Sequence, residues 1–347
     1  MREGTVKRFC CLAAVCVFAS AVVVSSREAV AQEHRIKFAT VAPEGSTWMK
    51  IMHEFDDAIR NESGGRLGFK IYAGGVQGED KDVMRRIRGG QLHSAGFTGF
   101  GIGEISSKLR ILDTPFLFKD HDEVDYLHKV FDTEFDLEFE ENGFVLLGWA
   151  EVGLAYVFTN EPVRSSSDLK GVKMWMWEGD PVAEAAFTAL DVTPIPLSLV
   201  DVLTSLQTGL IDAAYATPLS ALVLQWNTRV EYMTRVPLAN VSGAVVMSKR
   251  KFDSIPPDLQ EMLVRNGKKY MAELTRRSRL ENDEAIGTLI RNGVKVVEVT
   301  SPATLKEYVD LGRKARKSLV GSLFDQKFLD RIEKTIADYR KEHSGSQ

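Results

Sequence analysis

The segment from residue 35 to residue 87 alternates strand-like and helix-like patterns, and this alternation constrains the fold more than any other feature. Residues 35–40 alternate apolar and polar side chains as a strand does, and residues 67–71 do so again. Between them, apolar side chains recur at helical spacing from Trp48 to Ile59, and a second such stretch reaches Ile87. A strand–helix–strand–helix order predicts a parallel sheet in an α/β protein.

A short internal sequence repeat extends this pattern. Residues 90–95 and residues 209–214 each follow an amphipathic stretch, and each joins a helix-ending glycine to a short apolar strand. The repeat favours two similar lobes over one large sheet. Pro256 and Pro257 open a helical stretch that extends to about Arg291, which is long enough to lie across both lobes.

The first residues of the chain have the composition of a secretory signal peptide. Lys7 and Arg8 precede an apolar run over residues 9–24, and Ala29-Val30-Ala31 has the small residues of a cleavage site. We therefore expect residues 1–31 to be a signal peptide that is cut after Ala31, which places the mature protein in the periplasm. No later stretch approaches the roughly 18 apolar residues of a membrane span.

All three cysteines, Cys10, Cys11 and Cys16, lie in this leader. The mature protein is therefore expected to form no disulfide and to hold no metal through thiolates. Lipidation of Cys16 in place of cleavage after Ala31 remains an open alternative, although Val15 is a poor residue before a lipidated cysteine.

The mature chain is mildly acidic. Removing the four basic and two acidic residues of the leader from the 44 and 48 of the whole chain leaves 40 and 46, a net charge near −6. An acidic surface argues against nucleic acid as a partner.

No catalytic arrangement stands out in the sequence. It contains no His-Glu-x-x-His, no phosphate-binding loop that ends in Gly-Lys-Ser or Gly-Lys-Thr, and no Gly-x-Ser-x-Gly. Residues 99–103 resemble a dinucleotide-binding loop, but the third glycine comes one residue early. We therefore expect a binding protein without a cofactor, and not an enzyme.

The stretch from Lys173 to Pro181 is the strongest candidate for a ligand site. Strand-like alternation places Trp175 and Trp177 on one face. A turn follows, in which Asp180 can cap a helix that Pro181 begins. The end of a strand next to the start of a helix is where open α/β sheets bind ligands. The alternative is that both indoles belong to the core.

Four motifs resemble one known family. From about residue 36 to residue 330, the chain is similar to the extracytoplasmic solute receptors of tripartite ATP-independent periplasmic (TRAP) transporters, of the dicarboxylate-receptor type. The motifs that carry the resemblance are Gly-Gly-Val-Gln-Gly-Glu at 74–79, Leu-Asp-Thr-Pro-Phe-Leu-Phe at 112–118, Asp-Leu-Lys-Gly-Val-Lys at 168–173 and Ser-Leu-Gln-Thr-Gly-Leu-Ile-Asp at 205–212.

The resemblance implies a two-lobed periplasmic binding protein fold of the α/β class, with a hinge and a long helix that spans both lobes. It also implies closure on a small-molecule ligand, which is then passed to the membrane subunits of a TRAP permease. We expect lobe I to comprise residues 34–152 and 243–284, and lobe II to comprise residues 153–242 and 285–332. Residues 333–347 would form the end of a helix and a tail.

The sequence departs from the family at the site itself. The arginine that clamps a ligand carboxylate in the family falls on Trp175, and a second arginine falls on Ala155. Tyr215 and Thr217 stand in the Gln-Glu-Asn-Pro region, where one branch of the family has a metal-binding carboxylate, so no metal is expected. An apolar, aromatic or cationic ligand fits these residues better than a carboxylate does.

Our hypothesis is a largely apolar ligand of lipid-like character, with a polar end near Gln77, Thr98 or Thr217. The candidate ligand-binding residues are Trp175, Trp177, Tyr215, Thr217, Gln77, Trp48, Thr98, Phe100 and Ala155. For Gln77 the alternative role is capping, and for Trp48 it is the apolar stripe of its helix. Asp113 and Asp212 are expected to close turns through backbone hydrogen bonds.

Other functions stay open at this point. A protein of the same fold could act as a carrier or sensor that hands an apolar ligand to a periplasmic helper protein. It could also bind a carboxylate through a different cation. A periplasmic isomerase or lyase ranks last, because the candidate site offers no convincing general base.

Overall fold

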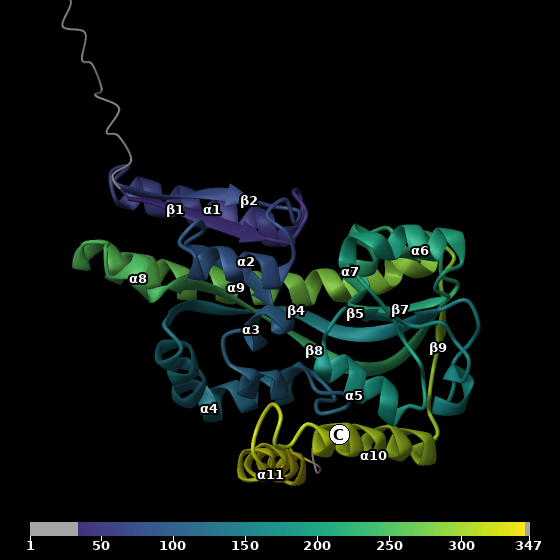
Figure 1. The fold of residues 1–347 in the computed structure, drawn as a ribbon. Helices are drawn as coiled ribbons and strands as arrows, with labels where there is room; N and C mark the ends of the chain where they lie inside the picture. Colours follow the sequence, from purple (N-terminus) through teal and green to yellow (C-terminus); the bar gives the residue numbers. More distant parts are fainter. Residues whose placement is uncertain (1–33, 344–347) are drawn as a thin grey trace, which may run out of the picture.

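The computed structural model describes residues 34–343 (Figure 1). The expected signal peptide over residues 1–31, with its cysteines and cleavage site, lies outside the described residues, as do residues 344–347. Within the described part, none of the helices combines the length and the apolar character needed to cross a membrane.

The N-terminal part follows the predicted alternation. It consists of β1 (His34–Thr40), α1 (Thr47–Glu62), β2 (Leu67–Tyr72), α2 (Asp80–Arg88) and β3 (Ser94–Thr98). Strand β1 pairs in parallel with β2 and with β3, as the sequence pattern predicts. Ser46 caps α1 by accepting a hydrogen bond from the Met49 N–H, and one face of this helix buries Met52, Phe55 and Ile59.

Beyond β3 the main sheet is antiparallel except for a short parallel pairing of β9 (Lys295–Val297) with β8 (Tyr232–Ser248), so the prediction of a parallel sheet is wrong for β8, β4 (Phe144–Thr159) and β7 (Ala213–Ala216). Strand β8 pairs antiparallel with β3 and with β4, and β4 pairs antiparallel with β7. The strand order is β2-β1-β3-β8-β4-β7, and β9 adds to β8. The strand–helix–strand order predicts parallel strands only where a helix connects one strand to the next. No crossover helix connects β3 directly to β8, so this order does not determine the direction of β8.

The molecule has two halves, one around β1, β2 and β3 and the other around β7, and both share this one sheet. Strands β4 and β8, of 16 and 17 residues, run from the side of β1 and β3 to the side of β7 (Figure 1). The sequence pattern favoured two lobes over one large sheet, whereas the hydrogen-bonded sheet is continuous between the halves. A bulge between Glu151 and Gly153 interrupts the β4–β8 register where the predicted lobe boundary falls.

Helix α9 (Pro257–Arg291) follows both halves along one face of the sheet (Figure 1). It packs against β4, against α1 on one side and against α7 (Pro218–Val223) on the other. The remaining elements are α3 (Gly99–Gly103), η1 (Ser107–Asp113), α4 (His121–Glu141), η2 (Ser166–Leu169), β5 (Trp175–Trp177), α5 (Pro181–Ala189), β6 (Ile195–Leu197), η3 (Leu199–Asp201), α6 (Val202–Thr208), η4 (Trp226–Thr228), α8 (Lys249–Phe252), α10 (Pro302–Ser318) and α11 (Gln326–His343).

Candidate functional site

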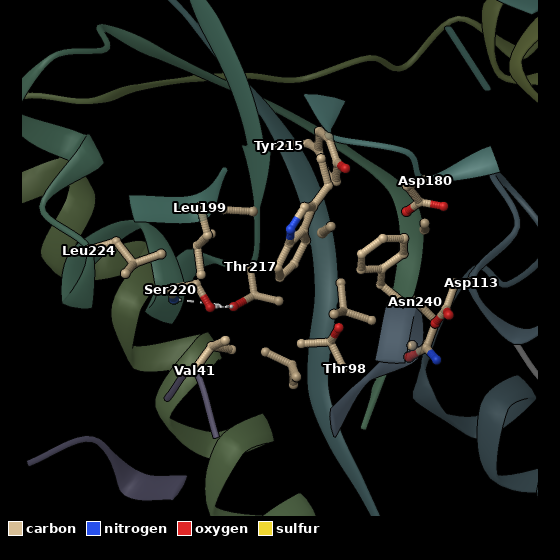
Figure 2. A pocket seen from close by; sticks show the side chains of 18 of the residues that line it. Val41, Thr98, Asp113, Asp180, Leu199, Tyr215, Thr217, Ser220, Leu224 and Asn240 are labelled. Carbon is tan, nitrogen blue, oxygen red and sulfur yellow. Dashed lines mark hydrogen bonds between the residues drawn. The ribbon is translucent and has the colours of Figure 1, made fainter. Parts of the chain in front are cut away.

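A cavity of about 230 Å³ lies between the two halves. Figure 2 shows side chains from β7, α7, the loop after β1 and the middle of β8 around it. Eight of the predicted site residues line this cavity: Trp48, Thr98, Phe100, Ala155, Trp175, Trp177, Tyr215 and Thr217. Gln77 does not line it. Its side chain accepts a weak hydrogen bond from Arg86 at 3.4 Å, on the loop that follows β2.

The two indoles of β5 form one wall of the cavity. Trp175 and Trp177 lie on the same face with ring centroids 6.0 Å apart, as the alternation predicts. Trp175 stacks on Tyr215 at 4.8 Å, and its Nε1–H donates to the Leu197 carbonyl oxygen at 3.1 Å. Because these rings are buried and also line the cavity, the core and pocket interpretations both apply to them.

Polar groups at the end of β7 are already engaged. Thr217 caps α7: its Oγ1 accepts from the Ser220 N–H at 3.2 Å and bonds to Ser220 Oγ at 2.9 Å (Figure 2). Burial raises the pKa of the Tyr215 hydroxyl, so it stays protonated at neutral pH. Neither residue presents an ionised group to a ligand.

Residues from β3, α3, β4 and α1 complete the cavity wall. Phe100 packs against Trp177 with ring centroids 5.6 Å apart, and Ala155 is fully buried on β4. Thr98 Oγ1 donates to the buried Asp80 at 2.7 Å, so it can offer a ligand an acceptor but no donor. Trp48 lines the cavity with an Nε1–H that has no hydrogen-bond partner.

A buried charge cluster in the lining was not predicted from the sequence. Arg110, on η1, donates through Nη2 to both carboxylate oxygens of Asp180, at 2.9 and 3.0 Å. Its Nε lies 3.3 Å from Asp113 Oδ2, within ion-pair distance but without hydrogen-bond geometry. Asp113 does not close a turn, because its Oδ1 accepts from the Ser242 N–H of β8 at 2.8 Å. Burial raises the pKa of Asp113.

The spacing of glycines in α3 was a signal for this cluster. A Cβ at Gly99 would lie 1.7 Å from Asp113 Oδ2, and a Cβ at Gly103 would lie 2.7 Å from Arg110 Cδ. Only glycine allows α3 to pack this closely against the charged side chains. The glycine-rich stretch over residues 99–103 therefore makes room for buried charge, which accounts for its resemblance to a dinucleotide-binding loop.

The electrostatics of the lining disfavour a free anion. Arg110 is the sole cationic side chain among the described residues that line the cavity, and Asp113 and Asp180 are the acidic ones. One guanidinium faces two carboxylates, so the ionised cluster carries a net charge of −1. A ligand carboxylate would have to displace an existing partner of Arg110 in a low-dielectric site.

Hydrogen bonds close the two halves over the cavity. Glu79, before α2, accepts from Trp177 Nε1 at 2.9 Å and from the Leu199 N–H at 2.7 Å. Lys81 Nζ donates to the Gly179 carbonyl oxygen at 3.4 Å. Within residues 34–343, no group of three or more histidine, cysteine, aspartate or glutamate residues is placed to hold a metal ion.

An α/β protein whose two halves close over a buried, mostly apolar cavity has the architecture of a solute-binding protein. The model of the bacterial extracellular solute-binding protein family 7 (DctP) matches residues 38–311, and the chain belongs to this family. Members of this family are periplasmic solute receptors of TRAP transporters rather than enzymes, and they deliver small-molecule ligands to a membrane permease. The recognition from sequence motifs is thus confirmed.

Two curated relatives are similar over most of the chain. The 2,3-diketo-L-gulonate-binding periplasmic protein YiaO of Escherichia coli is 26% identical over 278 residues, which are 78% of this chain and 79% of that protein. The C4-dicarboxylate-binding periplasmic protein DctP of Rhodobacter capsulatus is 24% identical over 294 residues, which are 83% and 84% of the two chains.

Solved structures confirm the predicted fold class. A TRAP solute-binding protein of Shewanella oneidensis with bound succinate superposes with a TM-score of 0.81 at 19% identity, covering 87% of this chain and 99% of that one. A Citrobacter koseri protein with bound D-glucuronate gives 0.77 at 21% identity, covering 88% and 99%. At these identities the likeness establishes the two-lobed fold and leaves the ligand of this chain open.

Proposed function

We propose that this TRAP receptor binds a largely apolar or aromatic ligand in the cavity and delivers it to the permease. The observation that carries the proposal is the state of Arg110, which is the sole described cation of the lining and is already paired with Asp180 and Asp113. The relatives named above bind dicarboxylates or sugar acids, whose carboxylates need an available positive charge.

The surroundings of this pair support the same ligand class. Position 175, where the family resemblance places an arginine, holds an indole that stacks on Tyr215. Position 155, where it places a second arginine, holds a fully buried alanine. Aromatic faces and small apolar side chains favour apolar ligands over ionised ones.

The cavity volume indicates the size of the ligand. A dry cavity of about 150 Å³ accommodates benzene, and this cavity measures about 230 Å³. It therefore has room for one aromatic ring with a short side chain or for a compact aliphatic compound. We favour such a compound over the longer, lipid-like ligand of the initial hypothesis.

A second candidate is a carboxylate receptor that uses Arg110 as its cation. The observation in its favour is that Arg110 lines the cavity. Such binding would require the guanidinium to leave Asp180, or would require the burial of a third negative group beside it. A carrier that works with a periplasmic helper protein instead of a permease remains a further alternative with the same ligand class.

Native mass spectrometry of protein purified from the periplasm without refolding tests the proposal. We expect a co-purified compound without a carboxylate. Calorimetry with succinate, D-glucuronate and sialic acid should detect no micromolar binding, and such binding by any of them would contradict the proposal. Trp175→Ala should weaken binding of the co-purified compound at least tenfold, whereas Trp175→Phe, which keeps the stack on Tyr215, should retain most of it.

A further inference from the structure

An unpaired amide oxygen and a carboxylate share one corner of the cavity lining. Asn240 is 2% exposed, and its Oδ1 has no hydrogen-bond partner, while its Nδ2 donates to Ser242 Oγ at 3.0 Å. Asp113 Oδ2 makes no hydrogen bond and lies 3.3 Å from Arg110 Nε in an ion pair, while its Oδ1 accepts from the Ser242 N–H. Because both side chains bond to Ser242, Asn240 and Asp113 belong to one corner of the cavity, as Figure 2 shows.

The charges of the lining also affect which ligand group this corner binds. Asp113, Asp180 and Arg110 all line the cavity, and together they carry one more negative than positive charge when ionised. Thus the field near Asn240 and Asp113 repels an anion and attracts a cation. The unpaired Asn240 Oδ1 needs a hydrogen-bond donor, because a buried acceptor without a donor is unfavourable.

We propose that this corner, formed by Asn240 and Asp113, selects a ligand head group that donates hydrogen bonds and is not anionic, such as a hydroxyl or an ammonium group. The apolar body of the ligand then lies against the aromatic wall of β5. This inference rests on the proposed function, because it assigns the polar end of that same apolar ligand.

A matched series of small aromatic probes separates the head group from the body. 2-Phenylethanol, 2-phenylethylamine and phenylacetate share a ring and a short chain that suit the cavity, and they differ in a neutral donor, a cationic donor and an anionic acceptor. Calorimetry at pH 7 with the full mature chain should show both donors binding at least tenfold more tightly than phenylacetate.

Two variants test the residues. Asp113→Asn keeps an oxygen for the Ser242 N–H and removes one negative charge, so it should weaken 2-phenylethylamine about tenfold, strengthen phenylacetate and leave 2-phenylethanol nearly unchanged. Asn240→Leu removes the free acceptor and should weaken both donor probes. Asp212→Asn removes a charge from an exposed ion pair with Lys173 outside the lining and should change none of the affinities.

The outcomes separate this inference from the proposed function. Equal or tighter binding of phenylacetate by the wild-type protein overturns the head-group assignment and leaves an apolar-ligand receptor standing. Unaltered selectivity in Asp113→Asn and Asn240→Leu, with melting temperatures that show folded protein, overturns it as well. Binding of none of the three probes also overturns it, and the proposed function fails with it if succinate or D-glucuronate binds.

Discussion

At the scale of single residues, burial decides what the charged side chains near the cavity can do. Asp80 is 1% exposed, and its Oδ2 accepts hydrogen bonds from the Thr98 N–H, Thr98 Oγ1 and the Gly101 N–H. These bonds hold β3 and α3 in place behind the cavity wall. Burial nevertheless raises the pKa of Asp80 to about 6, because removing a carboxylate from water disfavours its charged form.

Asp80 should make the protein less stable as the pH rises from 4 to 7. The folded-state pKa lies above the unfolded value of 3.8, so the stabilising contribution is complete below pH 4 and is lost as the pH rises through about 6. The loss is roughly 3 kcal/mol at 1.36 kcal/mol for each pKa unit. Urea denaturation should show that Asp80→Asn removes most of this dependence.

Asp258→Asn is the control for this measurement. Asp258 is exposed, and its hydrogen bond from Arg66 lowers its pKa, so any effect on the pH dependence should be small and opposite in sign. An unchanged pH dependence in Asp80→Asn would show that the buried carboxylate does not titrate in this range.

At the scale of elements, the bulge in β4 connects three parts of the fold. Gly153 has a φ of +131°, which an L-residue side chain rarely allows. Beside it, Asn282 of α9 donates from Nδ2 to the Val152 carbonyl oxygen at 2.8 Å and accepts at Oδ1 from the Leu219 N–H of α7 at 2.9 Å. The bulge, the long helix and α7 therefore meet at one asparagine, at the predicted boundary between the lobes.

Gly153→Ala should destabilise the protein by about 1–3 kcal/mol. A Cβ there would lie 2.6 Å from Asn282 Nδ2, in addition to the unfavourable φ. The control is Gly287→Ala in α9, the helix that also carries Asn282. Its Cβ would lie 3.4 Å from Arg291 Nη1, which is ordinary contact with a flexible side chain. It should stabilise the protein by about 0.5–1 kcal/mol. Equal unfolding free energies for both variants would show that the bulge tolerates a side chain.

At the scale of the whole molecule, hydrogen bonds and an ion pair hold the halves together, in addition to apolar packing of α5 and β5 against α3. Glu79 accepts two of these hydrogen bonds, from Trp177 Nε1 and the Leu199 N–H, directly beside the aromatic wall. Arg110 and Asp180 form a buried ion pair between the same two halves. Strands β4 and β8 connect the halves covalently and by hydrogen bonds, so opening has to bend the sheet rather than separate two domains.

Glu79→Ala should shift the unliganded protein toward an open form. The substitution removes two hydrogen bonds to a charged group that exist only when the halves touch, and a loss of about 1.4 kcal/mol changes such an equilibrium tenfold. Small-angle X-ray scattering should detect a larger radius of gyration. Glu178→Ala, at an exposed neighbour of Trp177, should leave the radius unchanged, and the same curve for both variants would contradict the role of Glu79.

The sequence by itself determined the features that depend on neighbours in the chain. Periodicity predicted α1, β2 and the common face of Trp175 and Trp177, and the Asp-Pro pair predicted the cap of α5. Family motifs predicted the fold class, and the departures from them led to Trp175, Ala155, Tyr215 and Thr217, which line the cavity. Each of these features is fixed by residues a few positions apart or by a motif read as a unit.

Only the tertiary structure decided the continuity of the sheet and the chemistry of the cavity. Asp180 looked like a simple helix cap, yet its second role is to pair with Arg110, 70 residues away in the sequence. In the corner of the cavity, Asp113 of η1 and Asn240 of β8 are brought together because both bond to Ser242. Such partners are brought together by packing that no local pattern encodes, because the energy of a buried charge depends on every group that surrounds it.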